Sequence, residues 1–213
     1  MSPKIVIVNY GIGNVKSIIN AFKYNGVDIL LTDDPKKILD SDGLVLPGVG
    51  AFKAGMDKLS EKNMVSVLRE FYKKNKPMLG ICLGMQLLFD QGEEFGIHKG
   101  LGLIQGAVKK INVNTNFNKL PHISWNNLEN SSLNWKNSIF NNINYKDKFY
   151  FVHSFAANPK NDSEVLSFTE YGNIKFCSAV KKNNLYGVQF HPEKSGEVGL
   201  KIINNFIKIC NGK

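Results

Sequence analysis

The chain has 213 residues, of which 43% are hydrophobic and 21% charged. These values are ordinary for a globular protein and exclude a disordered, collagen-like or coiled-coil chain. The length suits one domain spanning residues 1–213. The formal net charge of +9 at pH 7 is unusual, because such a charge first suggests a nucleic acid or an acidic membrane as partner.

The distribution of the charge argues against both partners. Arginine occurs only at Arg69, and the lysines stand singly or in pairs. Nucleic-acid readers usually rely on arginine forks with interleaved aromatic residues, and no stretch here is long and apolar enough to span a bilayer. Three cysteines without zinc-site spacing indicate a reducing compartment and no metal. The N-terminal apolar run is too short for a signal peptide, so we expect a soluble, cytoplasmic protein.

The first half of the chain alternates apolar strands with amphipathic helices. Apolar, β-branched runs predict strands at 5–8, 27–31, 43–47 and 78–81. Helical spacing predicts helices at 15–24, around 38–39, at 65–72 and at 83–89. This order predicts a parallel sheet covered on both faces, with ligands bound beyond the carboxyl ends of its strands.

The second half has a different pattern. Alternation with frequent turns predicts antiparallel hairpins over 102–124, and the polar segment 126–144 is expected to be a surface excursion. Further strands are predicted at 149–153, 174–177 and 185–190, and a closing amphipathic helix at 198–209. We find no repeat and no linker, so the prediction is one α/β domain.

One cysteine stands in a context that predicts a nucleophile. Gly80-Ile81-Cys82-Leu83-Gly84 is a Gly-x-nucleophile-x-Gly element between an expected strand and an expected helix, the pattern of a nucleophile elbow. A helix that begins after Cys82 favours a thiolate, and the N–H of Leu83 is placed to bind an oxyanion. A structural cysteine in a glycine-containing turn explains these five residues equally well.

A histidine and a carboxylate at the end of a later strand favour the catalytic interpretation. In Phe190-His191-Pro192-Glu193, His191 can act as a base toward Cys82 and then as an acid toward a leaving amine, while Glu193 orients the imidazole. The turn Pro47-Gly48-Val49-Gly50 can add a peptide N–H to an oxyanion hole, although a plain strand-end turn has the same sequence.

Together these motifs resemble class I (triad) glutamine amidotransferases, and more narrowly the glutaminase subunits of imidazole glycerol phosphate synthase in histidine biosynthesis. The resemblance covers essentially the whole chain. The narrower likeness rests on Tyr10-Gly11-Ile12-Gly13-Asn14, Gly48-Val49-Gly50-Ala51-Phe52, Pro121-His122, Trp125-Asn126, Phe151-Val152-His153-Ser154 and His191-Pro192-Glu193-Lys194-Ser195-Gly196. It implies a flavodoxin-like α/β fold with a central, mostly parallel sheet, flanking helices and a smaller antiparallel sheet.

The resemblance also implies a reaction, glutamine hydrolysis without a cofactor or metal, and a role for each matching residue. The catalytic triad would be Cys82, His191 and Glu193. The oxyanion hole would be formed by Val49, Gly50 and Leu83. The substrate glutamine would be held by Gly48, Gln86, Glu94 and Ser154.

A partner follows from the same resemblance. Ammonia would pass to a (β/α)₈-barrel cyclase subunit in a heterodimer, which forms imidazole glycerol phosphate and an aminoimidazole carboxamide ribotide. The partner interface or ammonia gate would comprise Asn14, Trp125, Asn126 and Lys194, and a packed core position is the alternative for Trp125. In the family, the glycine turn is thought to become productive only when the partner binds its own ligand.

Two departures from the family pattern leave the ammonia acceptor open. Asn9 stands where the family usually has aspartate, and Ser124 where it usually has glycine. A paralogous glutaminase that feeds a surface-sugar amidation partner is therefore an alternative within the family. A stand-alone cysteine hydrolase or peptidase, and a catalytically dead binding protein, are the alternatives from other classes.

Overall fold

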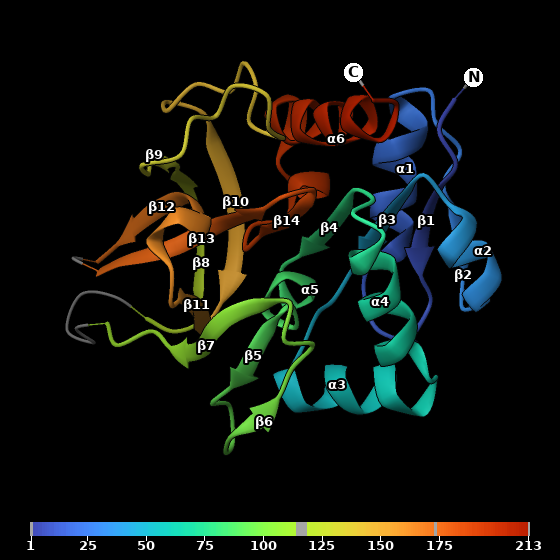
Figure 1. The fold of residues 1–213 in the computed structure, drawn as a ribbon. Helices are drawn as coiled ribbons and strands as arrows, with labels where there is room; N and C mark the ends of the chain where they lie inside the picture. Colours follow the sequence, from blue (N-terminus) through green and yellow to red (C-terminus); the bar gives the residue numbers. More distant parts are fainter. Residues whose placement is uncertain (1, 114–118, 173, 213) are drawn as a thin grey trace.

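The computed structural model describes residues 2–113, 119–172 and 174–212 (Figure 1). The first half contains β1 (Ile5–Val8), α1 (Val15–Tyr24), β2 (Leu30–Thr32), α2 (Pro35–Asp40), β3 (Gly43–Leu46), α3 (Phe52–Glu61), α4 (Met64–Lys73), β4 (Met78–Ile81), α5 (Leu83–Gln86), β5 (Phe89–Gly92) and β6 (His98–Lys99). The second half contains β7 (Ile104–Lys110), β8 (His122–Asn127), β9 (Glu129–Asn130), β10 (Lys148–His153), β11 (Phe155–Pro159), η1 (Asp162–Glu164), β12 (Val165–Tyr171), β13 (Ile174–Lys182), β14 (Leu185–Val188), η2 (Pro192–Lys194) and α6 (Gly196–Cys210).

Among the described residues, one large sheet runs in the order β2-β1-β3-β4-β14-β13-β11-β7-β5-β6, with β12 and β9 attached through β13. The strands from β2 to β14 are parallel to their neighbours, whereas β13 pairs antiparallel with both β14 and β11. The predicted parallel sheet of the first half is therefore confirmed. Because β14 lies parallel beside β4, the carboxyl ends of these two strands, which are far apart in the sequence, lie at the same edge of the sheet.

Alternate residues of the parallel strands bury opposite faces of the sheet. On one face, Ile5, Ile7 and Ile81 pack with residues of α1 and α6, and on the other, Val6 and Val8 pack with residues of α2, α3 and α4. Figure 1 shows these layers, with α1 and α6 on one side of the parallel strands and α3 and α4 on the other. Near-continuous apolar strands are the sequence signature of this doubly covered sheet.

A second, smaller sheet consists of β8 and β10, paired antiparallel with Trp125 opposite Tyr150. The chain passes directly from β10 into β11, which belongs to the large sheet, with Ser154 as the residue between them. This corner joins the two sheets, and residues 152–155 at the corner line the pocket described below.

Several boundary predictions in the first half were wrong. In the segment 27–31 only Leu30 and Leu31 belong to a strand, because β2 pairs with β1 from Leu30 to Thr32. The helix predicted over 83–89 ends at Gln86, since the carbonyls of Leu87 and Leu88 accept N–H groups from residues 101, 103 and 104 instead. The helix α3 was not predicted from the sequence.

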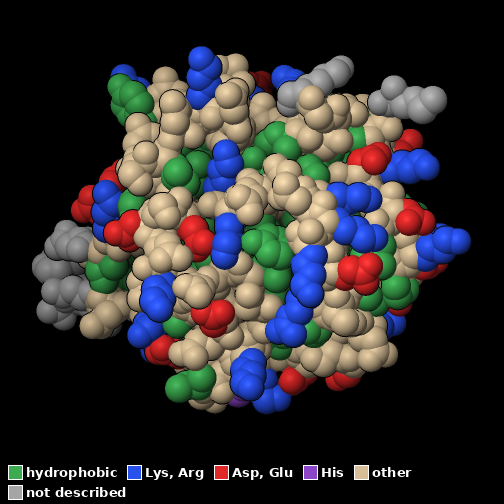
Figure 2. Space-filling model, in the orientation of Figure 1, with side chains coloured by type: hydrophobic (Ala, Val, Ile, Leu, Met, Phe, Trp, Pro, Cys, Tyr) green, Lys and Arg blue, Asp and Glu red, His purple; other side chains and the backbone are tan. Residues whose placement is uncertain are grey.

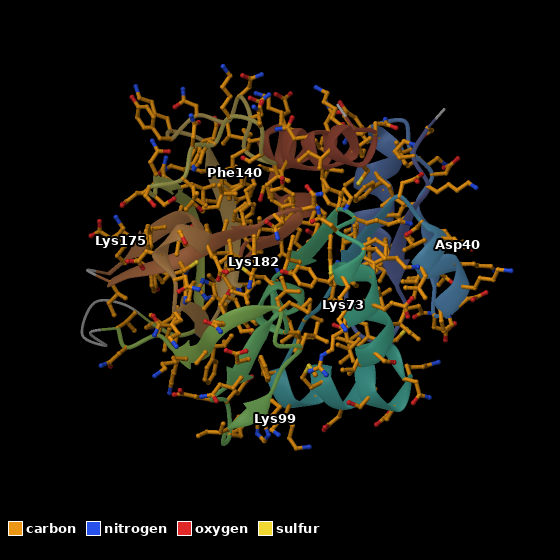
Figure 3. All side chains as sticks on the ribbon, in the orientation of Figure 1. Asp40, Lys73, Lys99, Phe140, Lys175 and Lys182 are labelled. Carbon is orange, nitrogen blue, oxygen red and sulfur yellow. The ribbon has the colours of Figure 1, made fainter. Side chains whose placement is uncertain are left out.

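Two predictions in the second half were also wrong. In the described parts of the segment 102–124, residues 102–113 and 119–124, the strands do not pair with each other: β7 pairs with β11 and β5, and β8 pairs with β10. The segment 126–144 is not merely a surface excursion, because Leu128, Ile139, Phe140 and Ile143 are buried in the core. Figure 3 labels Phe140 beneath the loop that joins β9 to β10.

The lysines are dispersed over the fold, as their spacing in the sequence indicates. Figure 2 shows Lys and Arg side chains scattered over the visible face among acidic and uncharged ones. Lys73, Lys99, Lys175 and Lys182, labelled in Figure 3, come from α4, β6 and β13. Within the described ranges the helices are too short or too polar to cross a membrane.

Candidate active site

The carboxyl ends of β3, β4 and β14 converge on one pocket of about 350 Å³. Its lining contains eight of the residues predicted for the site: Val49, Gly50, Cys82, Leu83, Gln86, Glu94, Ser154 and His191. Pro121, Val152, His153, Phe155 and Ala51 complete the lining. Parallel strands place residues that are distant in the sequence at one edge of the sheet, and ligands of such sheets bind there.

Cys82 lies on a strained turn between β4 and α5. Its backbone has φ 54° and ψ −113°, a region that non-glycine residues rarely adopt, and such strain concentrates at functional sites. The backbone N–H of Cys82 is held by the carbonyl of Val188 at 2.8 Å. The turn therefore presents the thiol at the pocket as a nucleophile elbow does.

Three glycines leave room for this turn. A Cβ on Gly84 would overlap the carbonyl oxygen of Leu46, and a Cβ on Gly80 would lie 2.7 Å from the carbonyl oxygen of Gly84. A Cβ on Gly48 would lie 2.8 Å from the N atom of Gly84. Gly48 does not line the pocket, so it acts by permitting the close approach of the 47–50 turn to α5.

His191 and Glu193 form a buried pair after β14. The Nδ1 atom of His191 lies 2.8 Å from Oε1 of Glu193, and the two side chains are only 3% and 1% exposed. The main chain around them is fixed, because the N–H of His191 donates to the carbonyl of Tyr150 and the hydroxyl of Ser195 donates to the carbonyl of His191. Glu193 thus orients the imidazole from the side away from the pocket.

The charges beside His191 set its protonation. Burial by itself lowers the pKa of His191, but interactions with Cys82 and Glu193 outweigh burial and raise that pKa to about 10. Cys82 raises the pKa of His191 through hydrogen bonding and, to a smaller extent, through charge attraction, and Glu193 acts in the same two ways. The raised pKa favours the imidazolium form of His191 at neutral pH, beside the sulfur of the elbow.

The side chains predicted to hold a substrate are themselves held by the protein. The amide nitrogen of Gln86 donates both to the carbonyl of Phe155 at 2.9 Å and to Oε1 of Gln189 at 3.0 Å. With both N–H bonds used inside the protein, Gln86 has its amide oxygen left for a ligand. Glu94 accepts the N–H of Phe52 at the start of α3, at 2.8 Å, and Ser154 lies at the corner between β10 and β11.

The predicted oxyanion hole has two parts. Leu83 is the first residue of α5, where backbone N–H groups have no partner within the helix. Val49 and Gly50 lie across the pocket on an exposed turn, and Gly50 adopts φ 96°. The turn is anchored two residues before Val49, because the buried hydroxyl of Tyr10 donates to the carbonyl of Pro47 at 2.6 Å. Tyr10 was quoted in a sequence motif but was not predicted as a site residue.

The residues predicted for a gate or interface lie outside the pocket lining. Trp125 is 47% exposed on β8, which excludes the packed core position. Its ring stands edge-on to that of Tyr150, at 5.9 Å between centroids, and Lys194 Nζ lies 5.8 Å from the centroid of the same ring. Asn14 is exposed at the start of α1. Tyr150, which the sequence reasoning missed, therefore connects Trp125 with Lys194.

The half-buried Asn126 adjoins a buried pair of histidines that the sequence reasoning also missed. Its side chain faces Nε2 of His122 at 3.4 Å, and Nδ1 of His122 lies 3.0 Å from Nε2 of His153. Burial, with a smaller contribution from His122, lowers the pKa of His153 to about 3, so His153 is neutral. The only sequence signal was the place of both histidines in strands with alternating apolar residues.

A cysteine elbow facing a His–Glu pair at the carboxyl edge of a parallel sheet is the arrangement of a thiol-dependent amidotransferase. A family model, glutamine amidotransferase class-I, matches residues 6–210, and the chain therefore belongs to the class I glutamine amidotransferase family. The predicted flavodoxin-like α/β fold of this family, with its smaller antiparallel sheet, is confirmed.

Within this family the chain is similar to subunits of one enzyme. It is 44% identical over 210 residues to imidazole glycerol phosphate synthase subunit HisH 1 of Legionella pneumophila (strain Lens), covering 96% of this chain and 99% of the relative. It is 45% identical over 202 residues to the HisH subunit of Bacillus mycoides (strain KBAB4), covering 95% and 93%.

Solved structures share the fold at lower identity. The structure of PurLQS from Thermotoga maritima matches with a TM-score of 0.73 and 20% identity, over 98% of this chain and 99% of that chain. A glutamine amidotransferase from Thermotoga maritima matches with a TM-score of 0.61 and 17% identity, over 91% and 77%. At this identity the likeness shows the fold alone.

Proposed function

We propose that this chain is the glutaminase subunit of imidazole glycerol phosphate synthase. In this role it hydrolyses glutamine and delivers the ammonia to a cyclase subunit of (β/α)₈-barrel type in histidine biosynthesis. The observation that carries the proposal is the pairing of Cys82 with a charged, buried His191–Glu193 pair at one pocket. The full-length similarity to HisH subunits supports the choice of enzyme.

The first half of the reaction releases ammonia. The thiolate of Cys82 attacks the side-chain amide carbon of glutamine, and the carbonyl oxygen becomes an oxyanion. The N–H of Leu83 and an N–H of the Val49–Gly50 turn stabilise this oxyanion. His191 is already protonated, so it gives its Nε2 proton to the departing nitrogen. The C–N bond breaks, and ammonia and a glutamyl thioester remain.

The second half of the reaction regenerates the enzyme. His191, now neutral, takes a proton from water, and the resulting hydroxide attacks the thioester carbon. The second tetrahedral intermediate collapses, the C–S bond breaks, and glutamate leaves with the thiolate and the imidazolium restored. Glu193 stabilises the imidazolium in each charged state through its 2.8 Å contact with Nδ1.

The substrate is held by groups that match the charges of a free amino acid. The amide oxygen of Gln86 and the carboxylate of Glu94 accept hydrogen bonds from the α-ammonium group of glutamine, and both residues line the pocket. Ser154 at the β10–β11 corner donates to a substrate oxygen. Gly48 lets the 47–50 turn, of which it is part, lie close to Leu83 and Gly84 at the start of α5.

Ammonia leaves toward the partner along the surface that bears Trp125, Tyr150 and Lys194. Trp125 and Lys194 each pack against Tyr150, and Asn14 and Asn126 belong to the proposed interface around them. A partner seated on this surface would keep ammonia from bulk water. The proposed site of action is the cytoplasm, where the histidine pathway operates.

The decisive experiment mixes the chain with a histidine-pathway cyclase and that cyclase's nucleotide substrate. We expect glutamine-dependent formation of imidazole glycerol phosphate, and we expect Cys82→Ala to abolish it while ammonium salts still support the cyclase. Ammonia-dependent turnover with no response to glutamine would contradict the proposal. Peptide cleavage without glutamine hydrolysis would instead identify a stand-alone cysteine hydrolase.

The ammonia acceptor is the part of the proposal that the departures at Asn9 and Ser124 affect. Neither residue lines the pocket: Asn9 is exposed after β1, and Ser124 lies in β8 opposite Phe151. They leave glutamine hydrolysis unaffected and bear only on the partner. Glutaminase activity that responds to a sugar-amidating partner and not to the cyclase would favour the paralogous role.

A further inference from the structure

Gln189 is a fully buried polar residue that the proposed mechanism leaves without a role. It follows β14 directly, is 0% exposed and does not line the pocket. The parallel register pairs Val188 with Ile81, so the next residues along the two strands, Gln189 and Cys82, lie side by side. The amide nitrogen of Gln189 lies 3.7 Å from Sγ of Cys82, within hydrogen-bonding distance for sulfur.

The orientation of the Gln189 amide is fixed by a backbone carbonyl. The carbonyl oxygen of Phe155 can only accept hydrogen bonds, so the Gln86 atom 2.9 Å away from it must be the amide nitrogen. The second N–H of that nitrogen points at Gln189, 3.0 Å away, so the Gln189 atom there must be the oxygen. The nitrogen of Gln189 is therefore the atom that faces the sulfur.

A second donor stabilises the same carbonyl. The Nδ1 atom of His153 lies 2.9 Å from the oxygen of Phe155, and it too must be an N–H. The neutral state of His153 is consistent with this assignment, because its other nitrogen then accepts from His122. Phe155 is thus a fixed anchor for the amides of Gln86 and Gln189.

We propose that Gln189 is a further catalytic residue, whose amide N–H donates to the thiolate of Cys82 and stabilises it from a buried position outside the pocket lining. A thiolate accepts stronger hydrogen bonds than a neutral thiol, because bonds to ionised groups are about twice as strong. The bond therefore favours the nucleophilic form before glutamine binds. This role rests on the proposed nucleophile Cys82, but it does not depend on glutamine or on the partner.

The first test measures the alkylation of Cys82 by iodoacetamide across pH, because only the thiolate reacts. Mass spectrometry of the Cys82 peptide separates it from the free thiols of Cys177 and Cys210. In Gln189→Met the midpoint of the alkylation profile moves up by about one pH unit, which makes alkylation about tenfold slower below the midpoint. Profiles of Gln189→Met and wild type that superimpose would overturn the proposal.

Ser178→Ala is the matched control. Ser178 is equally buried, and its carbonyl accepts the backbone N–H of Gln189 at 2.9 Å, but its hydroxyl contacts Ser167 rather than the sulfur. This variant perturbs the packing beside Gln189 without removing the amide, so its alkylation profile stays on that of wild type. A shift in Ser178→Ala as large as in Gln189→Met would identify a packing effect and overturn the assignment.

The second test needs no variant of Gln189 and so holds even if Gln189→Met fails to fold. In the wild-type chain labelled with ¹⁵N at glutamine side chains, the Gln189 amide resonance moves with pH at the same midpoint as Cys82 alkylation. The movement disappears in Cys82→Ser. A Gln189 resonance that does not follow the Cys82 midpoint would refute the hydrogen bond, whatever the outcome of the glutaminase assay.

Discussion

Glu193→Gln isolates the charge of the triad carboxylate from its geometry. The glutamine oxygen still accepts the Nδ1–H of His191 at the 2.8 Å position, but the negative charge is gone. A hydrogen bond to a charged group contributes about 1.5–3 kcal/mol and a neutral one about 0.5–1.5 kcal/mol. The difference is about 1.4 kcal/mol, or one pKa unit. Because both side chains are almost fully buried, solvent does not screen this difference.

The assay is the pH dependence of kcat/KM for glutamine, measured with the partner present. The reaction needs protonated His191 to release ammonia, and the pKa of His191 is about 10 in wild type. Loss of the Glu193 charge lowers that pKa, so the alkaline limb of the profile moves to lower pH by about one unit. An alkaline limb that coincides with that of wild type would refute the reasoning.

Glu197→Gln is the matched control, since Glu197 lies in the exposed first turn of α6, four residues further along the chain.

The same change in pKa predicts how the unfolding free energy depends on pH. The pKa of His191 is raised from 6.5 to about 10, so its stabilisation is complete below about pH 6.5 and is lost as pH rises through about 10. The pH-dependent difference in unfolding free energy between wild type and Glu193→Gln is therefore largest below pH 6.5.

Three further predictions concern the surroundings of the triad. Tyr10→Phe releases the carbonyl of Pro47 and loosens the oxyanion turn, so kcat falls about tenfold while KM for glutamine changes little; an unchanged kcat would contradict the anchoring role. Gly84→Ala forces a Cβ into the backbone of Leu46 and lowers the unfolding free energy by about 3 kcal/mol or more, measured by urea titration; stability within 0.5 kcal/mol of wild type would contradict the steric argument. Lys194→Ala weakens association with the cyclase and reduces its salt dependence, as titration calorimetry at two ionic strengths would show; a variant whose affinity equals that of wild type at each ionic strength would argue against an interface role.

The triad residues were predictable because local sequence places each at the end of a strand. The glycines around Cys82 and the proline and glutamate after His191 are short-range signals, and the parallel sheet brings them together. The role of each residue stays a prediction. Gln189 was not predictable as a site residue, because its contact with the sulfur depends on the register of β14 against β4.

Other features were hidden because long-range contacts override local pattern. Helical spacing continues through Leu87 and Leu88, but the N–H groups of residues 101, 103 and 104 donate to their carbonyls, and the chain continues into β5 instead. The abundance of asparagine between 126 and 144 makes the segment look like a surface loop, although Ile139 and Phe140 within it are 0% exposed in the core. The sequence predicted β1, β3 and β4 and the helices α1, α4 and α6 well, but it missed α3 and predicted poorly where the chain crosses between sheets.

The corner between β10 and β11 gives the pocket a wall that belongs to both sheets. Residues 152–155 line the pocket, yet β10 is paired only within the small sheet with β8, and β11 is bonded into the large one. Ile123 and Trp125 are exposed on β8, and β10, which pairs with β8, leads directly into the residues that line the pocket. A shift of the small sheet relative to the large one would therefore move the pocket wall at residues 152–155.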